Sequence, residues 1–208
     1  MKRLAFGLLA SILCAAPVFS ASLQDAMERY SSGDAATAAS IYGDLAAAGD
    51  PHAQFNMALM FYAGEGVPQS YSDAFTWAWR AKLQGIVQAE VLIGRVSDAI
   101  SNDTRTALAQ TLSDELSERI KSGDGRAMLA MSLIQTDLLP RPNAVQSYVW
   151  QSMAVAVGMT NAAGLRDATF AGLSNRDKTL AQSEARTAFA DWCASATKII
   201  PSCTVLLN

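Results

Sequence analysis

Few residues in this chain have the types and spacing that enzymatic chemistry requires. His52 is the only histidine among 208 residues, so neither a His-x-x-x-His metal site nor a Ser/His/Asp set with a choice of bases can be built. It follows a proline at the expected start of a helix, where a solvent-facing side chain is the simpler interpretation. Residues 64–66, Gly-Glu-Gly, follow a helix and precede no strand, which leaves a phosphate-binding loop without support. We therefore predict no metal site and no cofactor.

Carboxylates are the remaining groups that could do acid–base chemistry. Asp114, Glu115 and Glu118 lie on one predicted helix, close to Arg119 and Lys121. Pairing between side chains one turn apart on a solvated face explains them without catalysis. Two carboxylates brought together by folding are what a glycoside hydrolase uses, so an enzyme acting on the cell wall, or an accessory to one, stays open as an alternative. The residues favour a protein without catalytic activity.

The first twenty residues predict export. A basic pair, Lys2 and Arg3, precedes an apolar run over residues 4–16, and small residues before position 20 place signal-peptide cleavage after Ser20. The run is too short to span a bilayer comfortably. Cys14 lacks the small residue that precedes a lipidated cysteine, which argues against a lipoprotein.

Two cysteines remain after this cleavage, Cys193 and Cys203. An even pair in an exported chain predicts a disulfide, which would pin a tail, residues 194–208, to the last helix. Two free thiols are the alternative.

Cleavage also leaves a net negative charge. It removes Lys2 and Arg3 from the 16 basic residues, so that 14 face 19 acidic ones and the net charge is near −5. No basic stripe remains to neutralise phosphates, so we expect neither nucleic acid nor an anionic lipid surface as a partner.

Helical hairpins are the elements that the apolar spacing predicts. The clearest occupies residues 50–85, with Asp50 as N-cap and Pro51 in the first turn. Glycines and a proline within residues 64–68 break it into two helices. A smaller hairpin precedes it over residues 22–49, broken at residues 32–34. A single hairpin cannot bury its apolar stripe, so each needs neighbours.

The second half of the chain repeats the first. After a third helix over residues 86–97, Ser101 or Asp103 caps a long helix that ends near Lys121. Trp150 and Gly158 then follow Trp77 and Gly85 at an offset of 73 residues, and residues 174–182 match residues 101–110. This order predicts two duplicated four-helix units of about 73 residues, 50–123 and 124–193. The second unit has two prolines in place of the glycine turn.

The central hairpin resembles a Sel1-like repeat, a relative of the tetratricopeptide repeat, over residues 53–85. The hairpin of residues 22–49 is more loosely similar, and the long helices around residues 108–120 and 179–189 lie outside the pattern. The resemblance implies an all-α, right-handed α-solenoid over residues 21–193 that binds other proteins and has no chemistry of its own. The positions that carry it in the first unit are Ala53, Met57, Gly64, Gly66, Ala74, Trp77, Ala81 and Gly85. Those in the second unit are Ala127, Trp150, Ala154 and Gly158.

Four residues are candidates for contacting a partner. Trp77 and Trp150 occupy the packing position of the repeat and should be core. Trp79 points about 200° away from Trp77 around the helix, so it is either wedged against the next helix, which we favour, or displayed as a binding hot spot. The other three, Gln54, Asn56 and Tyr62, should face a groove.

The function we expect is that of a non-catalytic adaptor in the bacterial periplasm. As a monomer it would hold an envelope protein within an assembly such as a flagellar motor, a polysaccharide secretion system or a periplasmic signalling control. The residues do not identify that protein. A purely structural spacer is the other alternative to the cell-wall enzyme.

Overall fold

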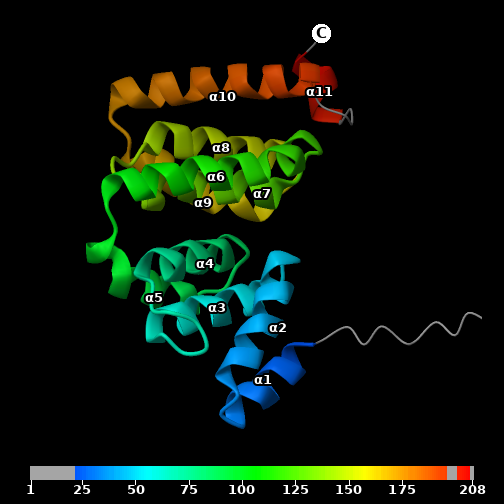
Figure 1. Cartoon of the computed structure of the whole chain (residues 1–208). Coiled ribbons are helices and arrows are strands. Elements are labelled where there is room, and N and C mark those ends of the chain that lie inside the picture. Colours follow the sequence, from blue (N-terminus) through cyan, green and yellow to red (C-terminus); the bar gives the residue numbers. More distant parts are fainter. Residues whose placement is uncertain (1–21, 196–200, 207–208) are drawn as a thin grey trace, which may run out of the picture.

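The computed structural model describes residues 22–195 and 201–206, and within them every regular element is a helix (Figure 1). The predicted signal peptide, residues 1–20, lies outside this part, as do residues 196–200 and 207–208 of the predicted tail. The α-helices are α1 (Leu23–Ser31), α2 (Ala35–Ala47), α3 (Pro51–Ala63), α4 (Tyr71–Leu83), α5 (Gln88–Val96), α6 (Asn102–Lys121), α7 (Gly125–Leu133), α8 (Ala144–Ala156), α9 (Ala163–Gly172), α10 (Asn175–Ser195) and α11 (Pro201–Leu206). Shorter turns of helix occur at Ser97–Ala99, Ile134–Leu138 and Thr160–Ala162.

The predicted helix boundaries of the first hairpins are confirmed. Asp50 accepts a hydrogen bond from the backbone N–H of Ala53 at 2.8 Å, with Pro51 in the first turn of α3. Gly64 ends α3 in the left-handed conformation, at φ 75°, which is the usual reason for a glycine at a helix C-terminus. Ser101 caps α6 by accepting from the N–H of Thr104 at 3.1 Å.

The turn between α3 and α4 fits closely against the start of α2. Gly66 has φ 71°, and a Cβ atom there would overlap the carbonyl oxygen of Ala35 and lie 2.6 Å from its carbonyl carbon. Only glycine fits this position, because it has both a left-handed backbone and backbone atoms against its α-carbon. The turn therefore joins the first two hairpins.

The helices follow one another through the molecule, and most of them pack against the next helix in sequence (Figure 1). One hydrophobic cluster is formed by residues of α1, α2 and α3, with partly buried side chains of the α3–α4 turn and of α4 packed against it. A larger cluster runs from α3 to α11. The long α10 lies along α8, and its Trp192 donates from Nε1 to the carbonyl of Ile120 in α6 at 2.8 Å. The far end of the molecule is thereby tied to its middle.

The predicted disulfide is present between Cys193 of α10 and Cys203 of α11, whose α-carbons lie 5.6 Å apart. It holds the short α11 against α10, and Ser202 donates to the carbonyl of Ala156 in α8 at 2.9 Å. No helix in residues 22–195 or 201–206 combines the length and the apolar character that a membrane span requires.

The predicted stop in the second unit has a different geometry from the first. After α7 the chain continues as a π-helical turn, Ile134–Leu138, before Pro140. Leu138 stands where the first unit has its glycine turn, and its side chain is fully buried. A buried leucine thus replaces the left-handed glycine.

The two repeat tryptophans pack against the core, as predicted, but they are less buried than expected. Trp77 and Trp150 are only partly buried, whereas Trp79 is 1% exposed. Trp79 is more buried than Trp77 because α4 packs against both α3 and α5, which enclose the face that carries Phe75 and Trp79. Trp77 lies at the boundary between the two hydrophobic clusters. Of the other predicted repeat positions, the alanines and Met57 are buried and the four glycines lie at exposed turns with positive φ.

Candidate functional site

A surface groove of about 590 Å³ lies over the central helix α3, with α1 and α5 on its two sides. We call it the α3 groove. An adjoining hollow of about 580 Å³ extends it towards the start of α1. The residues lining the groove are Tyr30, Tyr42, Phe55, Asn56, Leu59, Met60, Tyr62, Ala63, Glu65, Gln88, Val91, Leu92 and Arg95. Those that the hollow adds are Leu23, Met27, Ser31 and His52.

Large apolar side chains stand exposed along this surface. Met27 is 55% exposed, Leu59 41% and Val91 61%, and the ring of Tyr30 is 46% exposed. They come from α1, α3 and α5, so one apolar strip crosses three helices. Val87, which immediately precedes α5, is more exposed still. A contiguous apolar strip on a protein surface marks a binding site more often than isolated exposed leucines do.

Polar groups lie at the end of the groove where α1 and α3 finish. Tyr30 donates from its hydroxyl to the carboxylate of Glu65, in the turn after α3. This hydrogen bond and the negative charge of Glu65 raise the pKa of Tyr30 above its ordinary value. Arg95 of α5 also lines the groove, and among the described side chains it has no ion-pair partner within 4 Å. The groove therefore contains one hydrogen-bonded carboxylate and one unpaired cation.

The structure brings two of the four predicted binding residues into this groove. Asn56 and Tyr62 line it, and the ring of Tyr62 stacks on that of Tyr71 at 5.8 Å between centroids. Trp79 does not reach it: its side chain is buried, packed edge-on against Phe75. The alternative that Trp79 is displayed on the surface is thus wrong. The favoured interpretation, that it is wedged between helices, describes its position.

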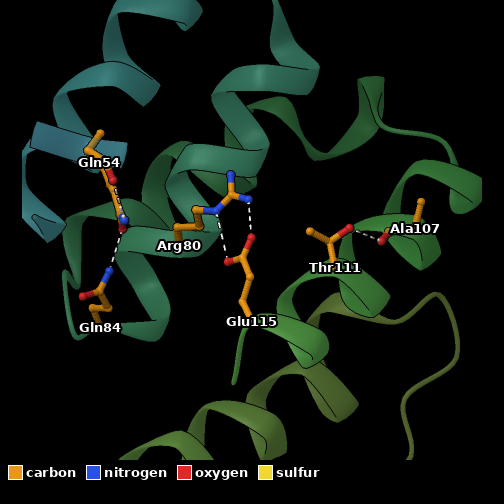
Figure 2. A network of polar contacts seen from close by, with 7 residues as sticks. Gln54, Arg80, Gln84, Ala107, Thr111 and Glu115 are labelled. Atoms are coloured by element: carbon orange, nitrogen blue, oxygen red, sulfur yellow. Dashed lines mark hydrogen bonds and ion pairs between the residues drawn. The ribbon is translucent and has the colours of Figure 1, made fainter. Parts of the chain in front are cut away.

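Gln54 does not line the α3 groove; it lines a second cleft, formed with α2, α4 and α6. Its side chain is 4% exposed and donates to the carbonyl of Ala46 at 3.2 Å. Its carbonyl oxygen accepts from Gln84 at 2.7 Å, as Figure 2 shows. Because α3 packs between α2 and α4, position 54 is covered even though it lies beside the apolar stripe of its helix. Gln54 joins three helices and is not a groove contact.

A second cleft of about 590 Å³, on a different set of helices, has its polar groups paired within the protein. Arg80 of α4 forms a two-bond ion pair with Glu115 of α6, at 2.6 and 3.3 Å (Figure 2). Its guanidinium also lies 5.0 Å from the ring of Trp77. Nearby, Lys82 binds Asp137 at 2.9 Å. We interpret this cleft as the joint between the α3–α4 hairpin and α6.

Sequence reasoning missed the exposed apolar side chains that form the strip. Leu59 and Val91 lie outside the apolar stripes of their own helices, which were assigned to the core. That misfit was the available signal, because an apolar residue on the polar face of a helix has no packing role there. Arg95 could not have been selected, since its lack of a partner depends on the tertiary structure.

The lining of the groove is mainly apolar and aromatic, and Glu65 and Arg95 are the charged groups in it. In the part of the chain that the structure describes, no three His, Cys, Asp or Glu side chains gather as a metal site would require.

Comparison with known proteins adds no family to this description. No protein-family model matches the chain, and a search of curated proteins finds no significant match. The fold and the groove define an all-helical protein with an apolar surface site, and the Sel1-like resemblance rests on the residues quoted above.

Proposed function

We propose that this protein is a periplasmic, non-catalytic adaptor that holds a segment of an envelope protein in the α3 groove, and that it acts as a monomer. The observation that carries the proposal is the exposed apolar strip of Met27, Tyr30, Leu59 and Val91. Covering it with a partner removes apolar surface from water, which stabilises a complex by about 25 cal/mol per Å² of that surface. Because α1, α3 and α5 are each held by packing against α2 or α4, little ordering cost opposes binding.

The proposal includes a right-handed, Sel1-like solenoid with an internal duplication. The succession of helices supports it: α4 and α8 have 13 residues each, and α6 and α10 have 20 and 21. Ser174 accepts from the N–H of Asp177 at 3.2 Å, the same cap that Ser101 forms at α6. Gly85 and Gly158 both have a left-handed backbone, at φ 100° and 107°.

Within this scheme the partner binds the first unit and the hairpin that precedes it. Leu133 matches Leu59 at an offset of 74 residues, but other groove residues have no equivalent in the second unit. The positions equivalent to Asn56 and Tyr62 are occupied by Ala130 and Thr136. The positions equivalent to Val91 and Arg95 are occupied by Gly164 and Ala168, neither of which has a large side chain.

The periplasm is the compartment that best fits the two ends of the chain. The predicted signal peptide at residues 1–20 directs export, and the disulfide between Cys193 and Cys203 is of the kind that persists in an oxidising compartment. Both features are expected of an exported bacterial adaptor.

Site-specific photo-crosslinking tests this function. A photoreactive benzoylphenylalanine replaces Val91 in the groove, and in a control replaces Leu165 of α9, which is 47% exposed outside it. In cells that produce the protein, we expect irradiation to join position 91 to one defined envelope protein. The Leu59→Asp variant, with an unchanged circular-dichroism spectrum, should lose that product.

Equal products from positions 91 and 165, or none from 91, would contradict the adaptor. In that case purified protein is incubated with peptidoglycan. Release of soluble fragments would then favour the cell-wall enzyme, and no release would favour the structural spacer.

A further inference from the structure

The charge of this protein is unevenly distributed along the chain. Residues 22–100, which build the α3 groove, contain nine Asp and Glu and four Lys and Arg, a net charge of −5. Residues 101–208 contain ten of each and are neutral overall. The negative charge that follows signal cleavage therefore belongs to the groove-bearing part.

Few of these nine carboxylates are neutralised by cations. Glu90 is the only one of them with a cation within 4 Å among the described residues, Lys82 at 3.9 Å. That lysine lies closer to Asp137, at 2.9 Å, and Arg80 is bound to Glu115. Two of the four cations are thus engaged by carboxylates outside residues 22–100.

Several of the carboxylates cap helices, which satisfies hydrogen bonds without removing charge. Asp34 and Asp50 accept from backbone N–H groups at the starts of α2 and α3, and Asp25 accepts from the N–H of Ser22. Helix N-termini offset such charges locally. At a distance the summed negative field remains and acts on an approaching ligand.

We infer that the occupant of the α3 groove is a basic amphipathic segment of a protein, with apolar side chains on the strip and Lys or Arg on its flanks. This inference rests on the proposed adaptor function and names the chemistry of its partner. The apolar side chains supply affinity, and the negative field of residues 22–100 supplies attraction and selection against acidic segments. Glu65, at the end of the groove, is the nearest acceptor for a basic side chain. Arg95 is the positively charged side chain in the groove lining, and it would repel a basic segment.

The strip also sets the length of the segment. Taking about 10 Å between neighbouring helices, crossing α1, α3 and α5 takes roughly 20 Å. That distance corresponds to about thirteen residues of helix or six of extended chain. A helix of this length places about five to seven apolar side chains on one face.

Fluorescence anisotropy with designed peptides tests the inference on the full mature chain. The probes are three fluorescein-labelled 14-residue peptides: Leu and Lys at helical spacing, the same with Glu for every Lys, and the same with Ser for every Leu. We expect the Leu/Lys peptide to bind at least roughly tenfold more tightly than either other. Raising NaCl from 20 to 500 mM should weaken it by roughly tenfold, since salt screens the field.

Variants assign the binding to the groove. Glu65→Gln should weaken the Leu/Lys peptide, and Arg95→Gln should strengthen it, each by a factor of about two to five, as expected of one exposed charge. Leu59→Ser should weaken it more than the control Leu165→Ser. Binding of the Leu/Glu peptide as tight as that of Leu/Lys, equal binding of the Ser/Lys peptide, or no binding of any probe would overturn the inference.

The two proposals fail separately. A defined crosslink from position 91 with no preference for the Leu/Lys peptide would keep the adaptor and reject a basic partner. Leu/Lys binding that Glu65→Gln and Leu59→Ser weaken, without any crosslinked protein in cells, would support the chemistry of the groove and reject the adaptor.

Discussion

Replacing Gly66 by Ala is predicted to separate the first two hairpins. The new Cβ would overlap the carbonyl oxygen of Ala35 and lie 2.9 Å from Cε of Met60. The methionine can move, but the carbonyl belongs to the backbone at the start of α2. Either that helix or the turn after α3 must therefore shift.

Gly33 provides the matched control. It also has a left-handed backbone, at φ 88°, but a Cβ there would meet nothing within 4 Å. Gly33→Ala should therefore show only the conformational cost, about 1 kcal/mol. Gly66→Ala adds the cost of overpacking, about 1–3 kcal/mol, for a total of about 2–4 kcal/mol. For a chain of this length, the excess over the control corresponds to a Tm difference of roughly 2–12 °C.

Urea unfolding followed by circular dichroism measures both variants, with the free energy of unfolding compared at equal slope. The reasoning would be refuted if Gly66→Ala were no less stable than Gly33→Ala. A further variant tests the cause: adding Ala35→Gly removes a side chain but leaves the carbonyl in place. It should not restore stability to Gly66→Ala.

Three other predictions concern the second half of the chain. Reducing the disulfide between Cys193 and Cys203 should cost about 3 kcal/mol for so short a loop and lower the Tm by roughly 6–12 °C in a calorimetric scan with and without reductant; an unchanged Tm would show that α11 contributes nothing. Trp192→Phe removes the hydrogen bond from Nε1 to the carbonyl of Ile120; because that carbonyl still accepts from the N–H of Gly123, the lost bond should cost about 0.5–1.5 kcal/mol in urea unfolding. Burial opposes ionisation of Asp124, but hydrogen bonds from Arg119 and from the N–H groups of Ala127 and Arg126 outweigh it and lower its pKa. Its contribution to stability is therefore present at neutral pH and is lost as pH falls below about 4, so Asp124→Asn should flatten the pH dependence of unfolding in that range; an identical dependence would contradict this assignment.

Local interactions explain why much of the fold could be predicted from the sequence. Asp50, Ser101 and Gly64 act on atoms within a few residues of themselves, so their types and positions sufficed to place helix ends. The disulfide followed from the count of cysteines left in an exported chain. These predictions needed no knowledge of which helices pack together.

The candidate site could not be predicted as well, because exposure is a tertiary property. Trp79 and Gln54 were assigned by their angle around a single helix, yet neighbouring helices cover both. Leu59 and Val91 have the composition of core residues and are exposed only because no described helix packs over them. Asn56 and Tyr62 line the α3 groove as expected, because one helix face was enough to decide their position; that they bind a partner stays a prediction.

The two halves of the chain differ in what stabilises them. Ser147 and Gln151 are buried in α8, at the positions where the first half has Ala74 and Ala78. The side-chain oxygen of Gln151 has no hydrogen-bond partner in the described part of the chain, and an unpaired buried acceptor costs about 1–3 kcal/mol. The disulfide between α10 and α11 offsets a cost of that size. The first half has an alanine-rich core and also an unpaired buried donor, Nε1 of Trp79, which no disulfide in the described residues offsets.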